Sequence, residues 1–99
     1  MTARSQATKE EIERKMKEAL NAVHVEIVDE TWKHVGHAGA AAGGGHFTLT
    51  VVSPRFEGVN PLDRRRLVFT VLETEMKGAI HALTVRTIAP SEWSPAERK

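Results

Sequence analysis

The chain has 99 residues, is 40% hydrophobic and 27% charged, and carries a formal net charge of +1. These values predict one small globular domain with a single core, and they exclude a molecule that binds polyanions through its overall charge. The absence of cysteine excludes disulfides and all-cysteine metal sites. No apolar run reaches membrane-spanning length and residues 1–8 hold no apolar signal region, so we expect a cytoplasmic protein without a membrane partner.

The first predicted element is an amphipathic helix over about residues 9–21, preceded by a flexible N-terminus at residues 1–8. Thr8 and Glu11 match a capping box, in which the hydroxyl caps the helix and the carboxylate reaches back. Asn21 suits the end of the helix. The apolar stripe predicted to face the core consists of Ile12, Met16, Leu20 and Val23.

Two strands are predicted next, over residues 24–32 and 46–52, because apolar and polar residues alternate in both. We expect them to pair antiparallel. The loop between them, residues 33–45, is long for a hairpin and rich in Gly, Ala and His, which favours a functional role. A turn-rich connection follows, in which Phe56 is the expected anchor into the core.

A second helix is predicted to start at Asn60, a good cap, with Pro61 at the first helical position and Asp63 facing the helix N-terminus. Lys77-Gly78 suits its end, with the glycine in a left-handed turn. Residues 82–88 alternate and predict a third strand, and Trp93 is expected to dock on the body. The apolar stripe of this helix contains Leu62, Val68, Phe69, Val71, Leu72 and Met76.

The expected fold is therefore a small single α+β domain of order α-β-β-α(α)-β. A three-stranded mixed sheet carries helices on one face, because a third strand reached through a helical crossover should run parallel to the second. The order of the strands remains open at this point. The other face of the sheet is predicted to carry Thr48, Thr50, Thr84, Arg86 and Glu26.

Four of the five histidines are the candidate metal ligands, since neutral imidazoles bind borderline metals. His34 and His37 lie in the long loop and His46 closes it, whereas His81 stands where the second helix meets the third strand. The alternatives are solvated loop histidines and, for His81, a side chain hydrogen-bonded to the backbone. A zinc or other metal site formed by the histidine loop alone is a further hypothesis.

Basic residues provide the second candidate site. Arg64, Arg65 and Arg66, together with Lys77 and Arg86, are candidates for phosphate contacts on a nucleic acid. Three consecutive residues of a helix point in three directions, so this run cannot form one flat patch. The alternative is a solvated helix face paired with local carboxylates such as Asp63. Catalytic and nucleotide-binding patterns are absent from the sequence, which predicts a protein that is not an enzyme.

Several separated motifs, in the same order, resemble the BolA family over about residues 10–93. They are Val28-Asp29-Glu30-Thr31 with His34, His46-Phe47, Val51-Val52-Ser53 with Phe56 and Gly58, Leu62 with Arg64, Arg66, Leu67 and Val68, Ile80-His81-Ala82-Leu83, and finally Pro90 and Trp93. The resemblance implies a BolA-like domain over residues 9–93, a C-terminal tail at residues 94–99, and a fold similar to class II KH domains.

The resemblance also implies a function. BolA-like proteins form heterodimers with monothiol glutaredoxins and share a bridging [2Fe–2S] cluster, with thiolates from the glutaredoxin and from glutathione. In this chain His81 would be the fixed ligand and His34 the loop ligand, with His37 and His46 as alternatives. Histidine in place of thiolate is a known form of cluster ligation. The isolated chain is expected to be a monomer without a cofactor.

A DNA-binding transcriptional regulator is the alternative function that the family implies, through its KH-like shape and helix-turn region. This sequence differs from the family pattern at Arg65, where the family usually has His, and in its longer, Ala- and Gly-rich loop. The added cation favours the nucleic-acid hypothesis.

Overall fold

The computed structural model describes residues 3–30 and 45–93 of the chain. Within these residues no helix is long and apolar enough to cross a membrane. The elements follow one another in the order α1 (Ala3–Leu20), β1 (His24–Asp29), β2 (Gly45–Val52), the short 3₁₀ helix η2 (Pro54–Phe56), α3 (Pro61–Val71), α4 (Glu73–Met76), β3 (Ile80–Ile88) and the 3₁₀ helix η3 (Pro90–Glu92).

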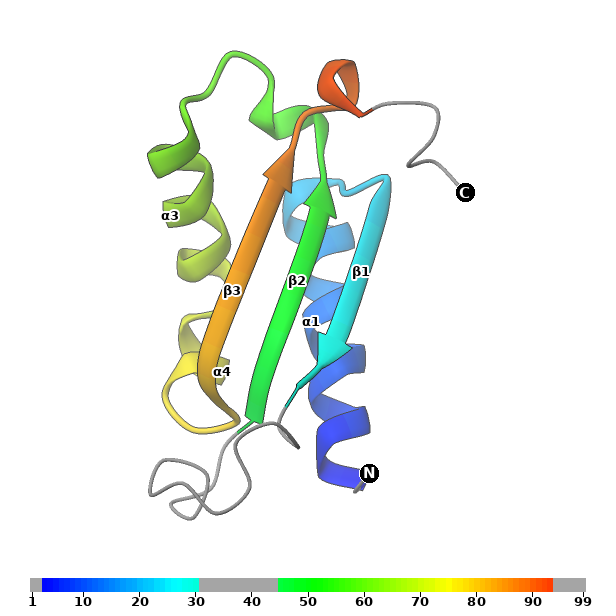
Figure 1. The fold of residues 1–99 in the computed structure, drawn as a ribbon, viewed down its shortest axis with the longest axis vertical. Coiled ribbons are helices and arrows are strands. Elements are labelled where there is room, and N and C mark those ends of the chain that lie inside the picture. The colour runs from blue at the N-terminus through cyan, green and yellow to red at the C-terminus, as the bar shows by residue number, and fades with distance from the viewer. Residues whose placement is uncertain (1–2, 31–44, 94–99) are drawn as a thin grey trace.

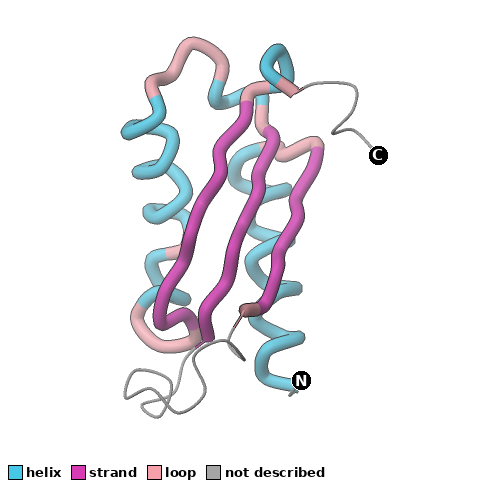
Figure 2. Tube along the Cα trace, in the orientation of Figure 1, coloured by secondary structure: helices cyan, strands magenta, loops and turns pink. Residues whose placement is uncertain are grey.

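The three strands form one sheet in the order β1-β2-β3. β1 pairs antiparallel with β2, and β3 pairs parallel with β2 after the crossover through α3 and α4. Figure 1 shows α1, α3 and α4 together on one face of this sheet, and Figure 2 shows the same layers coloured by secondary structure. The predicted α+β fold class, the antiparallel and parallel pairings and the single helical layer are confirmed, and β2 is the central strand.

The core lies between the sheet and the helices. Alternate residues of β2 enter it, namely Phe47, Leu49 and Val51, because successive side chains of a strand point to opposite faces. Phe56 of η2 is fully buried, so its predicted role as an anchor is confirmed. The helices contribute Ile12, Met16, Leu20, Val68 and Leu72 to the same cluster.

Helix α1 begins earlier than predicted. It starts at Ala3, so Thr8 lies inside the helix, and the predicted cap at Thr8 and helix start at residue 9 are wrong. Residues 3–7 contain no glycine or proline to stop the helix from extending. Asn21 ends the helix as predicted, with a left-handed φ of 52°. Val23 is 59% exposed and does not join the buried stripe.

Helix α3 begins as predicted. The Asn60 Oδ1 atom accepts a hydrogen bond of 2.9 Å from the Asp63 amide, and Pro61 occupies the first turn. Most of the predicted apolar stripe is confirmed, since Val68 and Leu72 are buried and Phe69, Val71 and Met76 pack against the core. Arg64 is buried as well, because residues four apart share a helix face and it lies one turn before Val68. Leu62 is 57% exposed, so its assignment to the core is wrong.

The second helical region also ends differently. It divides at Leu72 into α3 and α4, and Lys77 after α4 has a right-handed φ of −81°. The left-handed turn predicted at Gly78 is wrong. Among the glycines that the structure describes, the one with positive φ is Gly58, at 71°, in the turn after η2.

The face of the sheet opposite the helices is polar, and we call it the open face. The strand register places Glu26, Thr50 and Arg86 in one row across the three strands, and Val28, Thr48 and Thr84 in the next row. The polar side chains predicted for this face are therefore confirmed, and Val28 adds an apolar residue that is 43% exposed.

Candidate metal centre

The imidazole rings of His46 and His81 lie side by side on the open face. Their centroids are 5.0 Å apart and their planes are inclined by 45°. His46 is the second residue of β2 and His81 the second residue of β3, so two neighbouring parallel strands present the pair. His81 is exposed and His46 is partly exposed, so a partner molecule could reach both rings.

A β-bulge produces this arrangement. Gly45 pairs with Ile80, but His46 pairs with Ala82, so His81 is the extra residue on β3. Ile80 and Leu83 are both buried although they are three residues apart, which strict alternation would forbid. The bulge allows both to enter the core while His81 projects on the open face.

Backbone hydrogen bonds on both sides hold the position of His46. The Glu30 amide donates to the His46 carbonyl oxygen at 2.7 Å, and the Gly45 amide donates to the Ala79 carbonyl oxygen at 3.0 Å. The Thr48 hydroxyl donates to the Glu30 carboxylate at 2.8 Å, which brings that carboxylate to the same end of the open face. These hydrogen bonds tie the backbone of His46 to both neighbouring segments, Glu30 after β1 and Ala79 before β3.

His34 and His37, the predicted loop ligands, lie outside the described residues. Within residues 3–30 and 45–93, no group of three or more His, Asp or Glu side chains could hold a metal ion by itself. The two imidazoles nevertheless fit a shared iron–sulfur cluster in their chemistry, because they are accessible nitrogen donors on one surface. The thiolates that complete such a cluster must come from elsewhere, since the chain has no cysteine.

Arg64 lies in an internal contact and not in an exposed basic patch. Its Nε donates to the Val59 carbonyl oxygen at 2.6 Å, and its two terminal nitrogens lie 2.7 and 2.9 Å from the carboxylate oxygens of Glu92. The Arg64 side chain is only 10% exposed. The Arg64 guanidinium and the Ala89 amide lower the pKa of Glu92 to about 2, and the carboxylate raises the pKa of Arg64. We call this pair the Arg64–Glu92 latch.

The other predicted basic residues do not gather in one place. Arg65 and Arg66 lie on α3, where the Arg65 guanidinium stands 4.7 Å from the centre of the Phe69 ring and Arg66 approaches Asp63 at 3.4 Å. Lys77 follows α4, whereas Arg86 lies on the open face of the sheet. A nucleic acid contacting α3 would therefore not meet Arg86 on the same surface.

Two features were missed from the sequence. Glu92 is the partner of Arg64, and His24 packs against Trp93 with ring centroids 5.0 Å apart. The alternation in residues 24–32 places His24 on the same face of the sheet as Glu26. The sequence therefore contained a sign that His24 lies on the open face. Trp93 docks on the body as predicted, although the sequence contains no sign that its contact is His24.

Comparison with known proteins identifies the class. A family model described as BolA-like protein matches residues 16–92. The Bos taurus protein named BolA-like protein 1 is 40% identical over 82 residues, which are 83% of this chain. The Escherichia coli (strain K12) protein named DNA-binding transcriptional regulator BolA is 36% identical over 85 residues, covering 86% of this chain and 78% of that protein.

Solved structures agree with the sequence relatives. BolA1 from Arabidopsis thaliana matches with a TM-score of 0.73 at 30% identity, covering 96% of this chain and all of that one. The BolA domain of SufE1 from the same organism matches with a TM-score of 0.75 at 32% identity, covering 93% of this chain and 98% of that one. The chain belongs to the BolA-like family. It spans 58% of the length of the Bos taurus relative.

Proposed function

We propose that this protein is a non-enzymatic partner of a monothiol glutaredoxin and shares a bridging [2Fe–2S] cluster with it, in iron–sulfur cluster handling or iron-dependent regulation. Membership of the BolA-like family supports the class of function. The observation that carries the proposal in this chain is the pair of adjacent imidazoles on the open face, the exposed His81 and the partly exposed His46.

His81 is the proposed fixed ligand, because the bulge holds it outward at the start of β3. The second ligand is a histidine of the loop, His34 first and His37 next, or His46. Of these three residues, His46 has a described position, and that position supports it as a partner of His81 in binding one cluster. The cluster supplies electron transfer or iron delivery when bound, whereas the imidazoles attach it to this chain.

The test is a reconstitution with a monothiol glutaredoxin, glutathione, iron and sulfide, followed by visible absorption and circular dichroism. We expect a cluster spectrum that differs from the spectrum of the glutaredoxin homodimer. His81→Ala should abolish the difference. His34, His37 and His46 should then be replaced by alanine one at a time. We expect the cluster spectrum to change only in the variant that lacks the second ligand.

His24→Ala is the matched control, because His24 lies on the same face of the sheet at its opposite end. It should leave the spectrum unchanged. A mixture that shows only the homodimer spectrum would contradict the proposal, and so would an unchanged shared spectrum in His81→Ala.

A DNA-binding function is the second candidate. The name of the E. coli relative describes it as a DNA-binding transcriptional regulator, and Arg65 and Arg66 are exposed on α3 of this chain. Phosphate contacts by these side chains would make the affinity fall steeply with salt. Neutralising both arginines should then weaken binding and reduce the salt dependence, and unchanged binding would exclude this surface.

A further inference from the structure

The strand register places Glu30 beside His46 on the open face. The pairing of β1 with β2 joins Asp29 to Phe47, and the Glu30 amide donates to the His46 carbonyl oxygen at 2.7 Å, so the same register continues to Glu30 and His46. Side chains of a strand alternate between its two faces, so Glu30 lies on the same face as Val28, two residues earlier. A carboxylate and an imidazole are therefore cross-strand neighbours.

The Thr48 hydroxyl turns the carboxylate of Glu30 towards β2. It donates to Glu30 Oε1 at 2.8 Å, and Thr48 is two residues from His46 on the same face of that strand. In an antiparallel pair, the Cβ atoms of directly opposed residues are about 5 Å apart. A glutamate side chain spans this separation, so the carboxylate that Thr48 holds over β2 can reach the His46 ring.

The position of Glu30 does not make it a third metal ligand. In the part of the chain that the structure describes, no three His, Asp or Glu side chains are grouped to hold an ion. A carboxylate beside a metal-binding histidine has another common role, which is to accept a hydrogen bond from the ring nitrogen that does not bind the metal. This hydrogen bond fixes the tautomer and leaves the other nitrogen as the metal donor.

We propose that Glu30 is a positioning residue for His46. Its carboxylate, oriented by Thr48, accepts a hydrogen bond from one ring nitrogen of His46 and directs the other nitrogen to a metal centre shared with His81. A carboxylate accepts several hydrogen bonds at once, so Thr48 and the ring N–H can share it. This role rests on the proposed function, with His46 as the second ligand. Glu30 acts on His46 and not on His81, because β1 and β3 are roughly 10 Å apart.

The first measurement is the tautomer of His46 in the metal-free full chain. In protein labelled with ¹⁵N-histidine, the shifts of the two ring nitrogens show which one carries the proton, and His46→Gln assigns the signal. At about pH 8, where free histidine is neutral, we expect a single tautomer in the unaltered protein and a mixture in Glu30→Ala. Glu30→Gln should restore the single tautomer, because its amide oxygen still accepts a hydrogen bond. An unchanged tautomer in Glu30→Ala would overturn the proposal.

The second measurement is the affinity for Cu²⁺–iminodiacetate, with His34 and His37 replaced by alanine so that the described pair binds the ion. Glu30→Ala should weaken this affinity by roughly tenfold to a hundredfold, as the loss of a carboxylate behind a metal-binding histidine does. Thr48→Val should weaken it less, since it removes only the group that orients the carboxylate. An affinity that stays the same in Glu30→Ala would contradict the proposed role.

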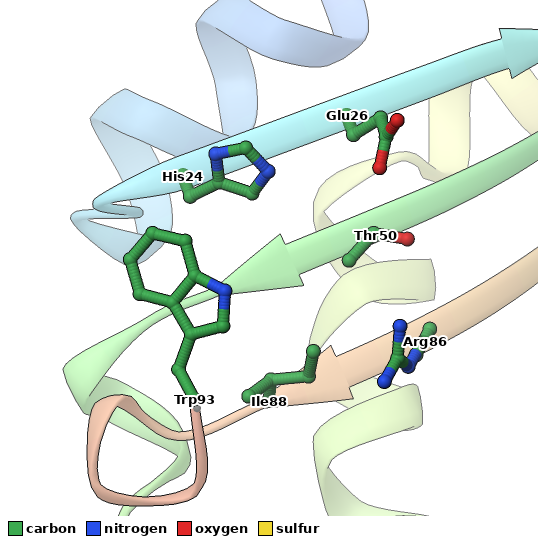
Figure 3. A pocket seen from close by; sticks show the side chains of 6 residues that line it. All are labelled: His24, Glu26, Thr50, Arg86, Ile88 and Trp93. Atoms are coloured by element: carbon green, nitrogen blue, oxygen red, sulfur yellow. The ribbon is translucent and has the colours of Figure 1, made fainter. Parts of the chain in front are cut away.

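Glu26→Ala is the matched control. Glu26 is another carboxylate on β1, four residues and so roughly 13 Å from Glu30. Figure 3 shows it with His24 in the recess at the other end of the open face. Removing this charge should leave the His46 tautomer and the chelate affinity unchanged. Equal effects of Glu26→Ala and Glu30→Ala would mean that only overall charge matters, and would overturn the positioning role.

Failure of this role and failure of the proposed function are distinguishable. The proposed function fails if the unaltered chain and a monothiol glutaredoxin show only the spectrum of the glutaredoxin homodimer. The positioning role fails in the metal-free chain, where the tautomer of His46 does not depend on any partner or cluster.

Discussion

His46 and His81 meet on the open face because β3 contains one residue more than β2 at this point. The pairing steps from Gly45–Ile80 to His46–Ala82, and the ring centroids of the two histidines end 5.0 Å apart. The same bulge keeps Ile80 and Leu83 both in the core. Both the packing of the core and the position of the histidine pair therefore depend on this one bulge. Bulges commonly redirect side chains at functional sites.

The first prediction concerns a metal chelated by this pair. In a background with His34→Ala and His37→Ala, Cu²⁺–iminodiacetate should bind His46 and His81 together, since neutral imidazoles at this spacing can ligate one ion. Calorimetric titration should show the affinity fall by at least roughly tenfold when either histidine is replaced by Ala, because the second contact is intramolecular. His24→Ala is the control, and an unaltered affinity in His46→Ala would mean that the rings do not share the ion.

Local patterns predicted much of this fold. The alternation in residues 46–52 correctly placed Phe47, Leu49 and Val51 in the core, and Asn60 caps α3 as its side chain suggests. These features depend on neighbours within four residues, which a sequence shows directly. The bulge at His81 was not predicted, because it depends on how β3 pairs with β2, more than thirty residues earlier in the chain.

On α3 one position of the predicted stripe, Leu62, was wrong for a related reason. Apolar spacing favoured Leu62 over Arg64, since a buried arginine is unusual unless it has a partner. Its partner is Glu92, which lies 28 residues away and beyond β3. The sequence contains the two residues but not their contact, and the same holds for His24 and Trp93.

The second prediction tests the corrected helix face with one kind of substitution at two positions. Leu72 is fully buried and Leu62 is 57% exposed. Leu72→Ala should lower the free energy of unfolding by about 2–5 kcal/mol, because it removes core contacts and leaves a cavity. Leu62→Ala should change it by less than about 0.5 kcal/mol. Urea unfolding measures both, and equal losses would contradict the described orientation of α3.

The third prediction separates the structural arginine from the exposed one. Arg64→Ala should lower the free energy of unfolding by about 2 kcal/mol, since it removes hydrogen bonds to Val59 and Glu92 and packing of the side-chain stem. Arg66→Ala should have little effect on stability, because the Arg66–Asp63 pair is solvent-exposed.

Arg64→Lys is the informative companion variant. It keeps the charge but cannot bind Glu92 through two parallel hydrogen bonds, so it should recover only part of the loss. If the chain binds DNA, Arg66→Ala should reduce the salt dependence by about one phosphate contact, and Arg64→Ala should not. A reduced salt slope in Arg64→Ala with native stability would place this side chain on the nucleic acid instead.

The fourth prediction follows from the low pKa of Glu92. The Arg64 guanidinium, with the Ala89 amide, lowers this pKa from 4.5 to about 2 in the folded protein. Between these two values the unfolded chain binds more protons at this carboxyl than the folded chain does, so stability rises with pH across the interval. The contribution of the Arg64–Glu92 latch is fully present above about pH 4.5 and is lost as the pH falls through about 2.

Glu92→Gln should therefore be less stable than the unaltered protein at pH 7, and this difference should stay constant down to about pH 4.5 and then shrink towards pH 2. Urea midpoints measured at pH 7, 4.5, 3 and 2 follow the difference. Glu73→Gln, at an exposed position on α4, controls for the loss of a carboxylate. At pH 2 the Glu92 carboxylate is becoming protonated. If Glu92→Gln is still as much less stable than the unaltered protein at pH 2 as at pH 7, the Arg64–Glu92 latch stabilises the fold through packing and not through the ionised carboxylate.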